Sequence, residues 1–432
     1  MKRQLLELQA DRIEAVLARH KVHAKVTGGS IAPRWVQFQV LPALGSRVNK
    51  IKNLADELAL ALDSDSCRVS RQGGMLLLQI PRSDPQPVRL LPLLRRLSHI
   101  EEGAPYAAED HGNRRASQPS RSVPFGSAVL GLGEDGVPLL VRLPSPQVAH
   151  ILIAGTTGSG KSALAQTIIT SLALCHRPSQ VGLILIDPKR RAFGKLAGLP
   201  HLLRPVLSEP AEIEETLEML VALMLTRDKE GRIAAGENSP GEPRVVVVID
   251  EVADLLMMTT KAVQHAITRL SQRGREPGIH LVVCTQKPAS KILGGLVKAN
   301  FPLRLVGRVT SPEDAKVATG YAGTGAEKLR GPGDFVAVSG GQISRFQAAF
   351  ISAAEIHQLL QKLGTNHRWR ESWPSADQVD VATVDAPYRA AQNSSMQPKR
   401  RAGHDLMGRQ TTRSFALGLS ARLAPAVLTE TV

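Results

Sequence analysis

The chain has 432 residues, of which 54 are Lys or Arg and 39 are Asp or Glu, so its formal net charge is +15. An apolar share of 43% is ordinary for a water-soluble protein, and the length is enough for two or three domains. No run of about 18 uncharged apolar residues occurs, and the first twenty residues are amphipathic and include acids. These features argue against a membrane span and a secretory signal, so we expect a cytoplasmic protein.

The basic excess indicates a polyanionic partner, either nucleic acid or an anionic membrane surface. Aromatic residues make up only 3% of the chain, which leaves little material for a base-stacking surface that grips single strands. Sequence-independent contact with the backbone of duplex DNA fits this composition better. Cys67, Cys175 and Cys284 are scattered without metal-ligand spacing, which favours a reducing compartment and argues against zinc.

Residues 1–100 predict a small α+β domain. A helix is expected over 4–20, followed by half-buried strands at 22–26 and 35–40. A second helix carries apolar residues on one face, and a strand follows at 74–80. The apolar positions of that second helix are Val48, Ile51, Leu54, Leu58 and Leu62. Residues 101–122 lack apolar periodicity and predict a flexible linker.

Residues 123–357 alternate short apolar strands with helical patterns. Helices are expected over 162–174, 211–226 and 261–271, between strands such as HILIAG, VGLILID, VVVVIDE and HLVVCTQ. Continuous apolar strands joined by helices are typical of a parallel sheet that is covered on both faces. Residues 358–432 form a polar tail, which we expect to be partly disordered.

A glycine-rich loop follows the first of these strands and precedes a helix. Its sequence, GTTGSGKS, has the spacing of a P-loop, in which backbone N–H groups and the helix amino terminus face phosphates. Lys161 is then placed to reach the β and γ phosphates, and Ser162 to ligate Mg²⁺. We expect ATP to contact Gly155, Thr156, Thr157, Gly158, Ser159, Gly160, Lys161 and Ser162.

Polar residues also end the strands at 244–249 and 279–285. Asp250 is suited to hold Mg²⁺, and Glu251 to polarise the attacking water, although both acids are also compatible with helix capping. Gln286 is suited to sense the γ phosphate, or is simply a strand-end amide. Because the acids accompany a P-loop, they favour ATP hydrolysis.

Several strings of the sequence, in order, resemble the motor domain of the FtsK/SpoIIIE family of DNA translocases. They are AGTTGSGKS, LILIDPK, GLPHLL, VVVVIDEVADLLM, GIHLVVCTQKPAS, LVKANFPLR and TGAEKLRGPGDF. Upstream, GGSIAPRWVQFQV and LLLQIPR resemble the small accessory domain of that family. The resemblance implies a RecA-like motor domain in a hexameric ring that moves double-stranded DNA with ATP and Mg²⁺. Lys161, Asp250, Glu251 and Gln286 match the family's catalytic positions.

Ring motors of this kind complete each active site with an arginine from the neighbouring subunit. Arg269, Arg273 and Arg275 are our candidates, and a solvated surface arginine is the alternative for each. For DNA contact we expect Arg273, Lys291 and Lys298, where solvated side chains are again the alternative.

The sequence lacks two features of the large family members, namely transmembrane helices and a winged-helix pattern after residue 360. We therefore do not expect attachment to a division septum or orientation by DNA sequence. The translocase could serve chromosome segregation or transfer of a mobile element. The alternatives are a coupling ATPase of a conjugation or secretion system and a nucleotide-binding DNA scaffold without motor activity.

Overall fold

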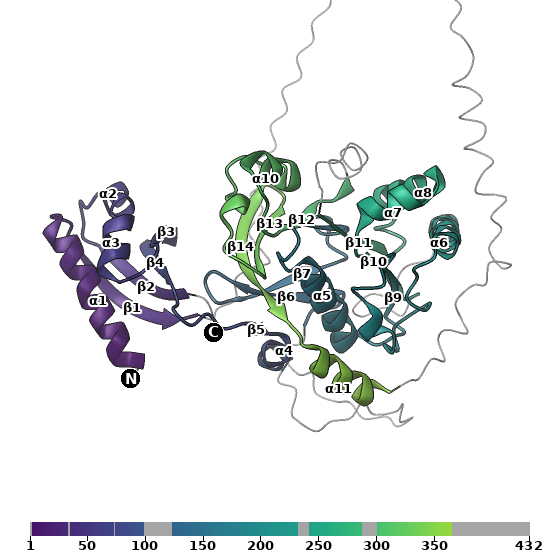
Figure 1. The fold of residues 1–432 in the computed structure, drawn as a ribbon, viewed down its shortest axis with the longest axis horizontal. Helices are drawn as coiled ribbons and strands as arrows, with labels where there is room; N and C mark the ends of the chain where they lie inside the picture. Colours follow the sequence, from purple (N-terminus) through teal and green to yellow (C-terminus); the bar gives the residue numbers. More distant parts are fainter. Residues whose placement is uncertain are drawn as a thin grey trace, which may run out of the picture.

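The computed structural model describes residues 2–32, 35–72, 74–98, 123–231, 242–286 and 300–364. An amino-terminal domain, purple in Figure 1, lies beside a larger domain coloured from teal to green; they are called the accessory domain and the motor domain after the resemblance given above. In the described part of the chain, no helix combines the length and the apolar character that crossing a bilayer requires.

The accessory domain is an antiparallel sheet of strand order β1-β2-β4-β3 with helices packed on it. This is the α+β class expected from the sequence, although β3 was not expected. Its core contains Ile13, Leu17, Phe38 and Leu78. The elements are α1 (Lys2–Arg19), β1 (Ala24–Ile31), β2 (Trp35–Pro42), α2 (Val48–Asn53), α3 (Ala55–Ala61), β3 (Arg68–Gln72) and β4 (Met75–Pro81).

The helix expected over Val48 to Leu62 is two short helices, because the chain leaves the helical path at Leu54. The Leu54 N–H donates to the carbonyl of Ile51, three residues back, and its φ and ψ are −90° and 15°. The apolar face nevertheless persists across the break, since Ile51, Leu54, Leu58 and Leu62 are all buried.

The motor domain is built on a ten-stranded mixed sheet within the described residues. Its parallel half has the strand order β12-β8-β11-β10-β9, which confirms the parallel sheet expected from the apolar runs. These strands are β8 (Ile151–Ala154), β9 (Val181–Ile186), β10 (Arg244–Ile249), β11 (Ile279–Thr285) and β12 (Leu303–Val306).

An antiparallel half, which the sequence analysis did not include, continues the sheet beyond β12 in the order β13, β14, β6, β7. A two-residue turn with positive φ at Gly340 (55°) and Gly341 (81°) joins β13 to β14. The strands are β6 (Ser127–Gly133), β7 (Pro138–Arg142), β13 (Asp334–Ser339) and β14 (Gln342–Phe350).

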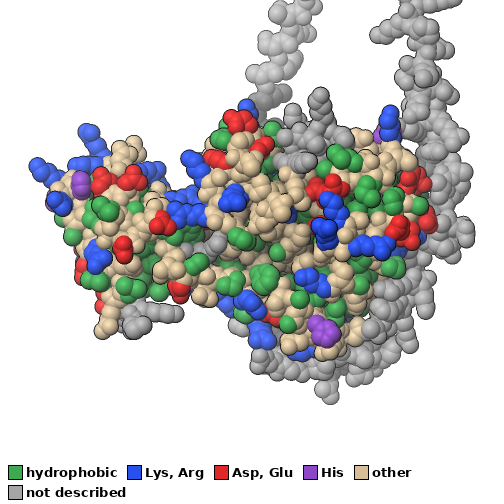
Figure 2. Space-filling view, in the orientation of Figure 1, with side chains coloured by type: hydrophobic (Ala, Val, Ile, Leu, Met, Phe, Trp, Pro, Cys, Tyr) green, Lys and Arg blue, Asp and Glu red, His purple; other side chains and the backbone are tan. Residues whose placement is uncertain are grey.

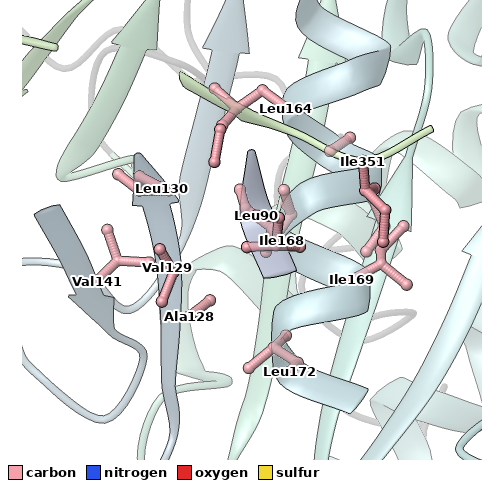
Figure 3. Close-up of a cluster of buried hydrophobic side chains, with 14 of the residues drawn as sticks. Leu90, Ala128, Val129, Leu130, Val141, Leu164, Ile168, Ile169, Leu172 and Ile351 are labelled. Atoms are coloured by element: carbon pink, nitrogen blue, oxygen red, sulfur yellow. The ribbon is translucent and has the colours of Figure 1, made fainter. Parts of the chain in front are cut away.

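Helices cover both faces of the sheet, and strand side chains alternate between the two cores. In β10, Val246 and Val248 belong to one core, while Val245, Val247 and Ile249 belong to the other. The helix after the phosphate loop, α5 (Lys161–Cys175), packs on the first face (Figure 3). The second face is covered by α6 (Pro210–Glu230), α7 (Val252–Met258), α8 (Lys261–Arg273) and α10 (Pro312–Thr319).

Two segments do not follow the expected domain boundaries. Residues 88–98, expected in the accessory domain, form β5 (Val88–Arg89) and α4 (Leu90–Ser98); β5 pairs with β14, and Leu90 is buried in the motor core. Helix α11 (Ala353–Leu363) crosses the expected boundary at 357, and its Leu359 is buried in the same core. Apolar contacts thus bind both segments to the motor domain. Residues 101–122, expected as a linker, and 365–432 lie outside the described residues.

Buried histidines form part of the motor core. His280 is 0% exposed; its Nδ1 contacts the carbonyl of Ala149 at 2.9 Å, and Arg244 lies 3.1 Å from its Nε2. Burial lowers the pKa of His280 to about 3 and the pKa values of His150 and His201 to about 4. These histidines are neutral structural groups, and the cysteines are free thiols.

The free energy of unfolding is expected to fall as the pH drops below about 6.5. Below that pH the histidines of the unfolded chain bind protons, whereas the same histidines stay neutral while they are buried in the folded protein. Each histidine contributes up to about 1.4 kcal/mol per pH unit between its unfolded and folded pKa values. Urea unfolding at pH 7.5, 6.0 and 5.5 measures the slope. His280→Asn should flatten it by one histidine's share, and a His280→Asn variant with the wild-type slope would contradict this account.

A glycine is required at position 131, where β6 has a bulge in its pairing with β7 and passes close to β14. Gly131 has φ of +157°, and a Cβ there would lie 2.0 Å from the carbonyl oxygen of Gln347. Gly131→Ala should therefore lower the free energy of unfolding by about 3 kcal/mol. Gly136→Ala is the control, because its φ of +79° costs only about 1 kcal/mol and nothing lies within 4 Å of its added Cβ. Urea unfolding of both variants tests the difference.

Candidate functional site

The candidate site lies at the carboxyl edge of the parallel strands. The phosphate loop follows β8, Asp250 and Glu251 follow β10, and Gln286 follows β11. The strands are in register, with Ala154 opposite Thr285 and Ile249 opposite Val283. Residues that are far apart in sequence therefore meet at one edge, as expected for a parallel sheet.

The glycines of the phosphate loop allow close backbone approach. Gly158 and Gly160 have positive φ, of +80° and +102°. A Cβ on Gly160 would lie 2.8 Å from the nitrogen of Gly333, and one on Gly155 would lie 2.7 Å from the Oγ of Ser159. Side chains at Gly155 and Gly160 would therefore collide with the loop itself or with the backbone behind it.

Hydrogen bonds hold the start of the loop against the end of β12. Thr156 donates to the carbonyl of Arg308 from its backbone N–H (2.8 Å) and its hydroxyl (3.0 Å). Lys161 is 6% exposed, and its Nζ donates to the carbonyl of Thr156 at 3.0 Å. Burial lowers the pKa of Lys161, while Glu251 and Asp250 act in the opposite direction. The ammonium is thus held inside the loop beside two acids.

Ser162 and Asp250 meet directly, because the Ser162 hydroxyl donates to Oδ1 of Asp250 at 2.8 Å. A hydroxyl and a carboxylate are the hard oxygen ligands that Mg²⁺ prefers, so this pair fits the ion. No group of three or more His, Cys, Asp or Glu side chains among the described residues is arranged to hold a metal. An ion bound by Ser162 and Asp250 would therefore complete its shell with phosphate oxygens and water.

Glu251 is 6% exposed, and its two carboxylate oxygens have different surroundings. Its Oε2 accepts a hydrogen bond from the backbone N–H of Gln286 at 2.9 Å, whereas Oε1 is buried and has no hydrogen-bond partner in the described structure. Burial raises the pKa of Glu251 above its usual value, and the hydrogen bonds from Thr285 and Gln286 lower it. Burial likewise raises the pKa of Asp250, against the hydrogen bond from Ser162. A carboxylate fixed in this way beside the phosphate loop is suited to accept a proton from water.

Gln286 joins the loop to the acid pair. Its side-chain Oε1 accepts a hydrogen bond from the Thr157 hydroxyl at 2.7 Å, while its backbone N–H contacts Glu251. The structure thus brings together the phosphate loop, Asp250, Glu251 and Gln286.

The candidate arginines lie at the other edge of the sheet. Arg269 and Arg273 are in the last part of α8, and Arg275 lies in the turn between α8 and β11. Because β11 has seven residues, Arg275, which lies near its amino end, is about 20 Å from the carboxyl edge. Arg273 pairs with Asp228 at 2.8 Å and Arg275 with Glu276 at 3.5 Å. None of the three reaches its own phosphate loop, so action on a neighbouring subunit stays a prediction. Lys291 and Lys298 lie outside the described residues.

One site neighbour was missed by the sequence analysis. Asp187, directly after β9, is 0% exposed, and its Oδ2 accepts hydrogen bonds from the N–H groups of Ala192 and Phe193 at 2.7 and 3.0 Å. Its negative charge also raises the pKa of Asp250. An acid directly after a wholly apolar strand is the signal that could have identified it.

Comparison with family models identifies both domains. Residues 1–81 match the FtsK alpha domain, and residues 114–233 and 231–290 match the FtsK/SpoIIIE family. A DNA translocase FtsK of Staphylococcus epidermidis is 33% identical over 430 residues, covering 92% of this chain and 50% of that protein. DNA translocase SpoIIIE of Bacillus subtilis is 32% identical over 384 residues, covering 83% and 46%. The chain thus spans about half the length of the curated relatives it matches.

A solved structure with a similar fold is the cytoplasmic domain of the type VII secretion ATPase EccC of Thermomonospora curvata. It is 24% identical with a TM-score of 0.51, covering 63% of this chain and 34% of that one. At this identity the likeness shows the fold alone. Both family models and the relatives agree that the chain belongs to the FtsK/SpoIIIE family.

Proposed function

We propose that the chain is an ATP-dependent translocase of double-stranded DNA that works as a hexameric ring of identical subunits. The observation that carries the proposal is the hydrogen bond between Ser162 and Asp250, which places the phosphate loop against an acid pair. The relatives named DNA translocase supply the cargo class, and the net charge of +15 suits a DNA backbone.

Each residue of the site has a role in this proposal. Lys161 binds the β and γ phosphates of ATP, and Ser162 and Asp250 hold Mg²⁺, which neutralises phosphate charge when bound. Glu251, held at Oε2 by the Gln286 N–H, accepts a proton from the attacking water. Gln286 accepts a hydrogen bond from the Thr157 hydroxyl through its side chain and donates one to Glu251 from its backbone N–H. It therefore fixes the position of Glu251 relative to the phosphate loop.

A ring gives a role to the candidate arginines, which lie far from the active site of their own subunit. An arginine at the amino edge of the sheet acts on the phosphates of the adjoining subunit. Arg269 is the freest of the three candidates, because it makes no ion pair with any described residue, whereas Arg273 and Arg275 do. Arg273, Lys291 and Lys298 are our candidates for contact with DNA phosphates. Since ATP and DNA are both cytoplasmic, the proposed activity places the chain there.

Duplex DNA should stimulate ATP hydrolysis many-fold, and Glu251→Gln should lower the stimulated rate by a factor of about 100 to 10,000, because it removes the proton acceptor. A steady-state phosphate-release assay with and without duplex measures both effects. Glu57→Gln, the same change at an exposed position of the accessory domain, is the matched control and should hydrolyse ATP normally. A Glu251→Gln variant with the wild-type rate would contradict the assignment, and an unstimulated wild type would favour a scaffold.

Translocation is tested by displacement of a third strand from a triplex. The wild type should displace the strand only with ATP and Mg²⁺, and Lys161→Ala should not, because the phosphates lose their main cation. Mass photometry on the same DNA should detect assemblies larger than a monomer. Folded protein that hydrolyses ATP on DNA but remains monomeric, or never displaces the strand, would contradict the ring translocase.

A further inference from the structure

The accessory domain contacts the motor domain at the tip of the β6–β7 hairpin. Gln37, Gln79 and Arg68 stand in a row across three adjacent accessory strands, with Gln79 opposite both others in the sheet register. Gln79 donates to the backbone carbonyl of Glu134 at 3.3 Å, and Gln37 donates to the same oxygen. Arg68 pairs with the Glu134 carboxylate. Because Gln37 and Gln79 are 4% and 0% exposed, this is a buried polar contact.

A second contact lies beside the first. The guanidinium of Arg345, on β14, lies 5.7 Å from the ring centre of Trp35, the first residue of β2, which is cation–π geometry. Arg345 is bound in turn to Asp334, with its Nε 2.9 Å from Oδ1. Trp35, Glu134, Asp334 and Arg345 line one small cavity between the two domains.

Asp334 is adjacent in sequence to a residue that supports the phosphate loop. The N–H of Gly333 donates to the carbonyl of Ser159 at 2.9 Å, and the carbonyl of Gly333 accepts from Ala348 at 2.7 Å. Gly160 approaches so closely that a Cβ on it would lie 2.8 Å from the Gly333 nitrogen. The two backbones therefore touch with no side chain between them.

Asp334 also binds the chain that leads to Gly333. Its Oδ2 accepts a hydrogen bond from the backbone N–H of Arg330 at 3.1 Å, and the Arg330 side chain reaches Ser66 of the accessory domain at 2.7 Å. Asp334 is 5% exposed, so water does not compete strongly for its carboxylate. Both arginines that Asp334 binds thus contact the accessory domain, and Figure 2 shows Lys and Arg side chains gathered where the domains meet.

We propose that Asp334 is a positioning residue that joins the phosphate loop to the accessory domain, so that nucleotide binding changes the surroundings of Trp35. Lys161 must leave the carbonyl of Thr156 to reach a phosphate, which alters the hydrogen bonds of the loop. Because the backbones of the phosphate loop and Gly333 are packed without free space between them, a change in the loop displaces Gly333 and its neighbours. The inference rests on the nucleotide-binding part of the proposed function and is independent of DNA translocation.

The test uses Trp35 as a reporter in the full chain. Replacing the other two tryptophans, by Trp369→Phe and Trp373→Phe, leaves Trp35 as the single tryptophan, which is excited selectively at the red edge of the absorption band. ATPγS with Mg²⁺ is titrated while emission is recorded, and calorimetry on the same samples measures binding. The emission should change saturably in this parent protein. Asp334→Asn should reduce the amplitude at least about fivefold while nucleotide still binds.

Two further variants sharpen the test. Arg345→Lys keeps the positive charge but lacks the planar group over Trp35, so it should also reduce the amplitude, and it serves if Asp334→Asn does not fold. Asp135→Asn, the same change at an exposed acid of the neighbouring turn, should keep the full amplitude. Unchanged emission despite calorimetric binding, or full amplitude in both Asp334→Asn and Arg345→Lys, would overturn the coupling alone. Absence of binding would overturn the nucleotide site as well.

Discussion

The site depends on the common direction and register of neighbouring strands. Ala154 is opposite Thr285 and Val306, and Ile249 is opposite Ile186 and Val283, so the strands end side by side. The residues after the strands therefore share one edge, with Gly155, Asp187, Asp250, Gln286 and Gly307 among them. Because successive side chains point to opposite faces, a one-residue slip of β10 would exchange its two core faces and move the acid pair.

Electrostatics explains why such a site favours a ligand. Burial raises the pKa values of Asp250 and Glu251 and lowers that of Lys161, so each group is pushed towards its neutral form. Attraction between the ammonium and the carboxylates opposes this effect only in part. Phosphates beside Lys161 and a cation beside Asp250 supply the missing countercharges. Binding should therefore stabilise the folded motor domain, since ligands that bind only the native state shift the folding equilibrium.

The sequence predicts the parallel half of the sheet well, because the strands and turns of that half have strong local sequence patterns. The strands at 181–186 and 245–249 are continuous apolar runs, and a glycine-rich turn with Lys161 leaves few alternatives. The antiparallel half is harder to predict from the sequence. Its strand β14 carries the polar residues Arg345 and Gln347, and its pairing depends on partners that are distant in the sequence. Contacts made by backbone atoms, such as the Arg308 carbonyl with Thr156, are almost independent of side-chain type and leave no pattern. A contact between subunits cannot be read from one chain.

The phosphate loop lies at the boundary between the two halves of the sheet, and this position links chemistry to domain arrangement. Its back rests on Gly307 and Gly333, and a Cβ on Gly307 would lie 3.0 Å from the Oγ of Ser159. Where backbones are this close, no side chain can rotate to make room, so a loop that reorganises around phosphates displaces its neighbours. The displaced residues lead into β13 and β14, which pair with β6, whose hairpin tip at Glu134 is held by the accessory sheet. The parallel half thus holds the reacting groups, and the antiparallel half connects them to the accessory domain.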